Sequence, residues 1–236
     1  MTKTNHFLIT CEHGGNRIPP RCRPLFTGFA ALLQTHRGYD AGALALAEDL
    51  AKALAAPLFA VTTSRLLIDL NRSIGHPRLY SEATRDAPAW VRRDILERYY
   101  RPHRDKVEAD IAAAVAKGNR VIHIASHSFT PVFDGMVRNA DIGLLYDPTR
   151  PGEAELCRRW QVRLRASSPE MKVRRNYPYA GKSDGLTAYL RRRFPAEAYI
   201  GIELEINQKH VFNGGRHWRA FRAGVIEALR QAVTDR

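Results

Sequence analysis

Cysteine is scarce in this chain of 236 residues, and long apolar runs are absent. The three cysteines, Cys11, Cys22 and Cys157, form no Cys-x-x-Cys pair and no even set, which excludes a disulfide scaffold and a zinc finger. No apolar stretch approaches the length of about 18 residues that a membrane-spanning helix needs. The first residues lack the basic-then-apolar layout of a signal peptide, so we expect a cytoplasmic protein without a membrane partner.

Acidic residues are also few, because 24 Asp and Glu stand against 37 Lys and Arg, a formal net charge of +13. Such an excess favours anionic partners such as nucleic acid or small carboxylates. The arginines are scattered in pairs and in one triple, Arg191-Arg192-Arg193, and form no basic tail. This pattern favours a solvated, arginine-rich surface over a face that binds a polyanion. With 44% hydrophobic residues, the chain can form a core as a single domain over residues 1–236.

Apolar runs typical of buried strands alternate with amphipathic patterns typical of helices. The predicted strands cover residues 6–11, 58–62, 65–70, 121–126, 142–146 and 199–206. The predicted helices cover residues 40–56, 88–117 with an interruption at Pro102, 152–166, 183–193 and 215–233. This alternation predicts a layered α/β fold with a mostly parallel or mixed sheet. In such folds, ligands bind beyond the carboxyl ends of the strands.

Polar side chains gather at the ends of three predicted strands. His13 follows the first strand, His127 follows the strand that begins at Val121, and Glu203 and Glu205 belong to the last strand. The two glutamates share one face of an apolar strand, which is costly unless they have partners. Two histidines and a carboxylate suit a zinc ion, and a further carboxylate could act as general base toward water.

Each candidate ligand also has a purely structural interpretation. His13 could be a turn residue, and His127 could be a buried histidine with satisfied hydrogen bonds. We interpret His123, in the same predicted strand, as a core residue. Asp40 begins a predicted helix, so its carboxylate could cap that helix, bind a metal ion, or do both.

A series of longer motifs extends over most of the chain. The motifs are CEHGGNRIP (11–19), HRGYDAGA (36–43), SRLLIDLNR (64–72), SHSFTP (126–131), ADIGLLYDP (140–148), NYPYAGKSDGLT (176–187) and IELEINQ (202–208). In this order they resemble the N-formylglutamate amidohydrolase family, in particular its group of predicted N-formylglutamate amidohydrolases. That family is in turn similar to zinc carboxypeptidases and aspartoacylases. The resemblance implies a single three-layer domain similar to the zinc carboxypeptidase, or phosphorylase/hydrolase-like, fold.

The resemblance also implies a metal site with one Zn²⁺. His13 and His127 would be ligands. The relatives place a glutamate three residues after the first histidine, where this chain has Asn16. Asp40 is therefore the first candidate for the third ligand, and Glu12 is the second.

Substrate binding is implied for residues of the later motifs. Asn71 and Arg72 would hold a substrate carboxylate, because a guanidinium pairs with a carboxylate through two parallel bonds. Arg72 could instead form a structural ion pair with Asp69 or with another acidic residue. Further candidates for substrate contacts are Arg138, Tyr177 and Tyr179.

The reaction implied by the resemblance is hydrolysis of the N-formyl or N-acyl amide of an acidic amino acid such as N-formylglutamate. Glu205 fits the family's late catalytic glutamate better than Glu203 and would take a proton from zinc-activated water. Arg65 or Arg72 would stabilise the oxyanion. Two alternatives stay open: a basic nucleic-acid-binding protein without catalysis, and a metal-binding member of the family with an altered acyl-amino-acid substrate.

Overall fold

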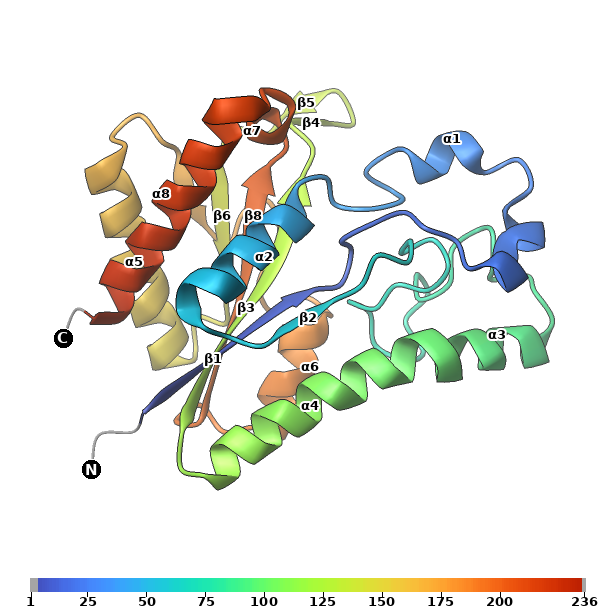
Figure 1. The fold of residues 1–236 in the computed structure, drawn as a ribbon, viewed down its shortest axis with the longest axis horizontal. Helices are drawn as coiled ribbons and strands as arrows, with labels where there is room; N and C mark the ends of the chain where they lie inside the picture. Colours follow the sequence, from blue (N-terminus) through green and yellow to red (C-terminus); the bar gives the residue numbers. More distant parts are fainter. Residues whose placement is uncertain (1–3, 235–236) are drawn as a thin grey trace.

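A six-stranded sheet lies at the centre of the structure, a computed structural model that describes residues 4–234 (Figure 1). The strands follow one another in the sheet as β2 (Leu58–Ala60), β1 (Asn5–Cys11), β3 (Arg120–Phe129), β8 (Tyr199–Asn207), β6 (Ile142–Leu145) and β7 (Val173–Arg175). The strands β2, β1, β3 and β8 are parallel, β6 is antiparallel to β8, and β7 is parallel to β6. A separate hairpin consists of β4 (Val132–Phe133) and β5 (Met136–Val137). The predicted mixed, mostly parallel sheet is confirmed.

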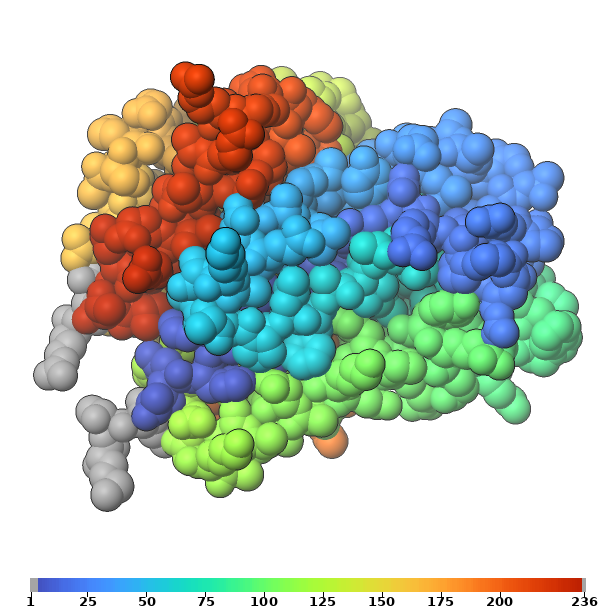
Figure 2. Space-filling view, viewed as in Figure 1, coloured from blue at the N-terminus to red at the C-terminus, as the bar shows by residue number. Residues whose placement is uncertain are grey.

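Helices cover both faces of this sheet, which makes three layers. The helices are α1 (Ala30–Leu33), α2 (Ala43–Leu54), α3 (Ala89–Ile95), α4 (Arg101–Ala116), α5 (Pro151–Ser167), α6 (Leu186–Arg193), α7 (Lys209–Phe212) and α8 (Gly215–Thr234). On one face lie α2, α5 and α8, and on the other lie α4 and α6. The surface seen in Figure 2 includes α8 in red, α2 in cyan, α4 in green and, in blue, the segment between β1 and α2.

The alternation of side chains along the central strands separates the two faces. In β8, Ile202 and Leu204 enter the large apolar cluster with α2, α5 and α8. Tyr199 packs in the smaller cluster with α4 and α6. Because side chains alternate along a strand, Glu203 and Glu205 share the face of Tyr199 and point away from the large cluster. The predicted common face of the two glutamates follows from this register.

Strand β3 is longer than predicted, because it continues through His127 to Phe129. His127 therefore lies within a strand and not after one. The register pairs His127 directly with Glu205 of β8. The extra residues bring His127 and Glu205 to the same edge of the sheet as the end of β1.

Two other local predictions are wrong. Residues 65–70 form turns instead of a strand, although Leu66 and Leu67 are buried in an apolar cluster under α3. A short apolar run indicates burial without specifying a strand. Pro102 does not interrupt the helical region, because α3, a π-helical turn (Leu96–Tyr100) and α4 follow one another without a gap. Pro102 is the second residue of α4 and follows directly on the π-helical turn.

Within residues 4–234, no helix combines the length and apolar character that crossing a membrane demands.

Candidate active site

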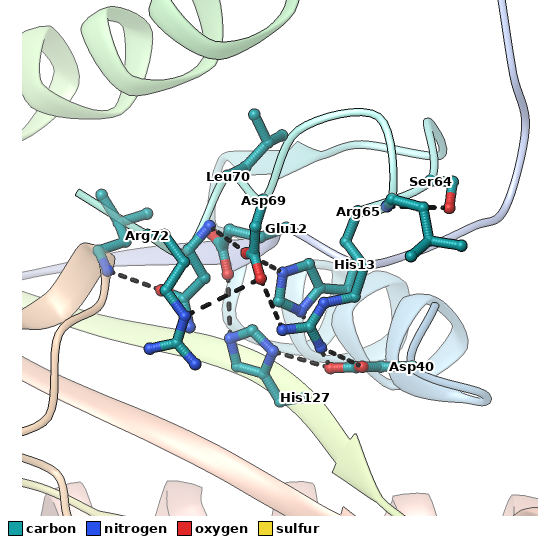
Figure 3. A network of polar contacts seen from close by, with 12 residues as sticks. Glu12, His13, Asp40, Ser64, Arg65, Asp69, Leu70, Arg72 and His127 are labelled. Carbon is teal, nitrogen blue, oxygen red and sulfur yellow. Dashed lines mark hydrogen bonds and ion pairs between the residues drawn. The ribbon is translucent and has the colours of Figure 1, made fainter. Parts of the chain in front are cut away.

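The loop after β1 carries His13 into a group of buried polar side chains (Figure 3). Two glycines follow His13, and a Cβ at Gly15 would lie only 2.7 Å from the carbonyl oxygen of Thr62. The absence of a side chain lets this loop pass close to the segment after β2. Hydrogen bonds from the amide of Gly14 to the carbonyl of Val61 hold the two segments together.

Asp40 reaches the same place from the loop before α2. Its amide donates to the carbonyl of His13 over 2.9 Å. The helix begins at Ala43, and Gly42, with a φ of 81°, precedes it without any side-chain cap. The interpretation of Asp40 as a helix cap is therefore wrong. The Asp40 carboxylate faces the imidazole rings of His13 and His127 instead.

His13, Asp40 and His127 form a compact group of possible metal ligands. The Nδ1 atoms of His13 and His127 lie 3.3 and 2.9 Å from Oδ2 of Asp40. One ligand atom of each residue lies within 4.8 Å of the others, and all three side chains are buried. Tetrahedral zinc bonds of about 2.0–2.1 Å to nitrogen and oxygen place neighbouring ligand atoms about 3.4 Å apart, close to these distances.

A carboxylate lies behind each imidazole, on the side away from Asp40. Nε2 of His13 lies 2.8 Å from Oδ1 of Asp69. Nε2 of His127 lies 3.1 Å from Oε2 of Glu12, within ion-pair distance but without the geometry of a hydrogen bond. Carboxylates in such positions fix the tautomer and orientation of metal-binding histidines and leave the Nδ1 atoms as ligands. Glu12 thus contacts the ring of His127 on the side away from Asp40 and is not one of the candidate ligands.

Asn16, at the position of the relatives' glutamate, is turned away from this group. Its side-chain amide donates to the carbonyl of Leu33 over 3.0 Å and to Oε1 of Gln34 over 3.1 Å. The third side chain beside the two histidines is therefore that of Asp40 and not that of Asn16.

The charges of the group favour a bound cation. Glu12, Asp40 and Asp69 are buried carboxylates, and Arg65 contacts Asp69 at 2.7 Å and Asp40 at 3.3 Å. Burial opposes a charged imidazole, but the contacts of His127 with Asp40 and Glu12 outweigh it and raise the pKa of His127 well above its usual value. The same carboxylates that stabilise a proton on the ring would stabilise a divalent metal ion in its place. The donor set thus fits such an ion in type, spacing and charge.

The two glutamates of β8 have different surroundings. Glu205 is buried, and its Oε2 has no hydrogen-bond partner among residues 4–234. Burial raises the pKa of the Glu205 carboxyl to about 7, and the nearby Asp40 adds to this effect against the opposing charge of His127. In contrast, Oε1 of Glu203 accepts a hydrogen bond of 2.7 Å from the hydroxyl of Thr187 in α6. Glu205 is the free carboxyl opposite His127.

Asn71 and Arg72 are both engaged with the segment before α6. Oδ1 of Asn71 accepts a hydrogen bond of 2.6 Å from the amide of Leu186, at the start of α6. The Arg72 guanidinium donates to the carbonyl of Asp184 over 2.6 Å and lies 4.0 Å from Asp69. The alternative interpretation of Arg72, a structural ion pair with Asp69, corresponds only to this long contact, and 22% of the Arg72 side chain is exposed.

Arg138 and Tyr179 lie together, with the guanidinium donating to the tyrosine hydroxyl over 3.1 Å. Arg138 also stacks on Phe133 of the β4–β5 hairpin, 4.4 Å from the ring centre. Charges of Glu205 and Asp40 act on the Tyr179 hydroxyl, whose pKa is raised mainly by burial. Tyr177 has different neighbours, because its ring lies 4.1 Å beneath the guanidinium of Arg174 in the edge strand β7.

Asp69 and His103 are absent from the residues that the sequence pattern suggests for the metal site. Asp69 belongs to the motif at 64–72, but nothing in that motif shows that Asp69 contacts His13. The contact exists only in the folded chain. His103 contacts Glu12 from α4, at 3.4 Å. The two residues are 91 positions apart, so no local pattern links them.

Comparisons with known proteins find a family model and solved structures that match the chain. The sequence model of the N-formylglutamate amidohydrolase family matches residues 5–212. The crystal structure of gene product Atu2144 from Agrobacterium tumefaciens is 30% identical, with a TM-score of 0.82 over 97% of this chain and 90% of that chain. The N-formylglutamate amidohydrolase from Ralstonia eutropha JMP134 shares the fold at 20% identity, with a TM-score of 0.69 over 98% of this chain and 94% of that one. Among curated proteins, nothing matches the chain.

Proposed function

The chain belongs to the N-formylglutamate amidohydrolase family, and on this premise we propose that it is a metal-dependent hydrolase that cleaves the N-formyl or N-acyl amide of a small acidic amino acid. The observation that carries the proposal is the buried group of His13, Asp40 and His127, with its Nδ1 atoms turned inward. These three side chains would hold one divalent ion, most suitably Zn²⁺. When bound, such an ion supplies a Lewis acid that polarises a carbonyl group and acidifies water.

Glu205 is the proposed general base. Its carboxyl is opposite His127 in the sheet, buried and without a hydrogen-bond partner at Oε2 in the described residues. A pKa of about 7 lets the group accept a proton from attacking water and return it to the leaving nitrogen near neutral pH. Glu203, which binds Thr187, has the weaker claim to this role.

Arginine side chains around the group suit an anionic substrate. Arg65 is bound to Asp40 and Asp69 and remains a quarter exposed, so it would hold those carboxylates in place and offer its remaining donors to an oxyanion. Arg72 and Arg138, with Asn71 and Tyr179, are the proposed contacts of the substrate carboxylates. Tyr177, stacked with Arg174, is the weakest candidate.

The proposal is tested by measuring metal content and amide hydrolysis in the same preparations. Purified protein is assayed for bound divalent ions and for release of acid from N-formyl-, N-acetyl- and N-succinyl-glutamate and -aspartate, before and after chelation. We expect at least one substrate to be cleaved, activity to be lost on chelation, and activity to return when Zn²⁺ is added. Turnover that is unaffected by complete removal of the metal would refute the proposed mechanism.

A further inference from the structure

A buried chain of polar contacts continues from the candidate ligands into helix α4. The far ring nitrogen of His127 lies 3.1 Å from Oε2 of Glu12, an ion-pair contact without the geometry of a hydrogen bond. The other carboxylate oxygen, Oε1, lies 3.4 Å from Nε2 of His103, in the first turn of α4. Glu12 is completely buried, and His103 is exposed by only 7%. Asp40, His127, Glu12 and His103 therefore form one continuous series.

Glu12 depends on both histidines for its orientation. Glu12 is completely buried, and its two carboxylate oxygens each contact one of these rings, Oε1 that of His103 and Oε2 that of His127. Without His103, Oε1 would lose its partner, and a buried carboxylate with one unpaired oxygen is destabilised and no longer fixed in one orientation. His103 thus holds Oε1 so that Oε2 remains directed at the ring of His127.

The start of α4 is attached to the site at two further points. The hydroxyl of Tyr100 donates to the carbonyl of Arg72 over 2.7 Å. The guanidinium of Arg104 donates to the carbonyl of Leu70 over 3.1 Å. Tyr100 ends the π-helical turn that precedes α4, and such turns, with their extra residue, are frequent at functional sites. The first turn of α4 is therefore fixed to the loop that carries Asp69, and His103 is held in a defined place.

We propose that His103 is a positioning residue of the metal site. Through Glu12 it keeps the His127 ring with Nδ1 toward Asp40, so that loss of His103 weakens metal binding although His103 is not a ligand. The proposal rests on the proposed function in one respect, because it requires that the site binds a divalent ion. It concerns the affinity of the site and makes no use of catalysis.

The chain offers a matched control in His6. Its Nε2 lies 2.8 Å from Oδ2 of Asp110, so this pair also joins β1 to α4. Both members of the pair are partly exposed, with 29% and 28% of their side-chain surface accessible. Substitution of His6 removes a contact between the same two elements without touching the series that leads to His127.

The test is a competition titration of Zn²⁺ against a chelating dye, with the parent protein and His103→Leu, His103→Gln, Glu12→Gln, His6→Leu and the double variant of Glu12→Gln with His103→Leu. We expect Glu12→Gln to weaken Zn²⁺ binding about 10- to 100-fold and His103→Leu to weaken it about tenfold. His103→Gln should restore part of the loss, because its amide can donate to Glu12. His103→Leu should add little in the Glu12→Gln background, since the two residues act in series.

Three results would overturn the proposal. One is parent-like affinity in His103→Leu, and another is an equal loss in His6→Leu, which would indicate a general effect of loosening α4. The third is an additive loss in the double variant. Thermal unfolding of the metal-free proteins identifies any variant that does not fold, and His103→Gln and Glu12→Gln then carry the test. A parent protein that binds no Zn²⁺ refutes the proposed function and this inference together, whereas a parent that binds and variants that match it refute the inference alone.

Discussion

Replacing Glu205 by glutamine is expected to remove turnover and also to change how stability depends on pH. The Glu205 carboxyl is buried, and burial raises its pKa from the ordinary 4.5 to about 7. The folded protein therefore keeps this proton at pH values where the unfolded chain has released it. Stability from this group is complete below about pH 4.5 and is lost as the pH rises through about 7.

The size of this effect follows from the two pKa values. Their difference corresponds to about 3 kcal/mol between the two protonation states. Between pH 5 and 8, the metal-free parent should thus lose about 2–3 kcal/mol of unfolding free energy relative to Glu205→Gln, in which nothing titrates at this position. The comparison uses the slope of unfolding free energy against pH in each protein. The cost of burying the glutamine amide does not depend on pH and therefore does not affect this slope.

The assay is urea unfolding of both chelated proteins at several pH values, with extrapolation to water. Turnover and metal content are measured on the same variant. We expect the metal to be retained and kcat to fall about 10²- to 10⁴-fold, the contribution of a general base. Parallel pH dependence in the two proteins would refute the reasoning from burial, and an unimpaired kcat would assign the proton transfer to another residue.

Further expectations concern the ligands, the core and the substrate. His127→Ala should lose most of the bound metal ion, as measured by elemental analysis, and unchanged metal content would reject His127 as a ligand. Burial lowers the pKa of His123 to about 3, so the parent should lose about 1.5–2 kcal/mol of unfolding free energy relative to His123→Gln between pH 6.5 and 5, as the unfolded chain takes up a proton. The same pH dependence in both proteins would contradict a neutral, buried His123. Arg138→Ala should raise KM about tenfold or more with little change in kcat, because it removes a charge-assisted contact with substrate, and steady-state kinetics that show the reverse pattern would place Arg138 elsewhere in the reaction.

The layered fold could be predicted from the sequence because strands buried on both sides and amphipathic helices leave strong and different patterns. The prediction was wrong where apolar residues alone had to specify a conformation. Leu66 and Leu67 are buried in turns, and nothing in their hydrophobicity distinguishes a turn from a strand. The strand predicted at 121–126 also ends too early, because His127 and Ser128 are polar residues buried within β3.

The candidate site could be predicted only in part, for a related reason. His13 and His127 are conspicuous because each follows an apolar run, and Asp40 is one of several possible third partners in the sequence. Asp69 and His103 were not predicted, since each acts behind another residue across a distance in sequence that only the folded chain closes. A local sequence pattern reflects the structure of the segment that contains it. Asp69 and His103 contact side chains of another segment, so their own segments carry no sign of this role.

The central claim is that His13, Asp40 and His127 bind one divalent ion through both Nδ1 atoms. Anomalous diffraction from crystals grown with Zn²⁺, recorded on either side of the zinc absorption edge, tests it most directly. We expect a single strong peak among the three side chains, about 2.0–2.2 Å from each Nδ1 and from the Asp40 carboxylate. A fully occupied zinc peak at other residues, or no peak among these three at saturating Zn²⁺, would contradict the account.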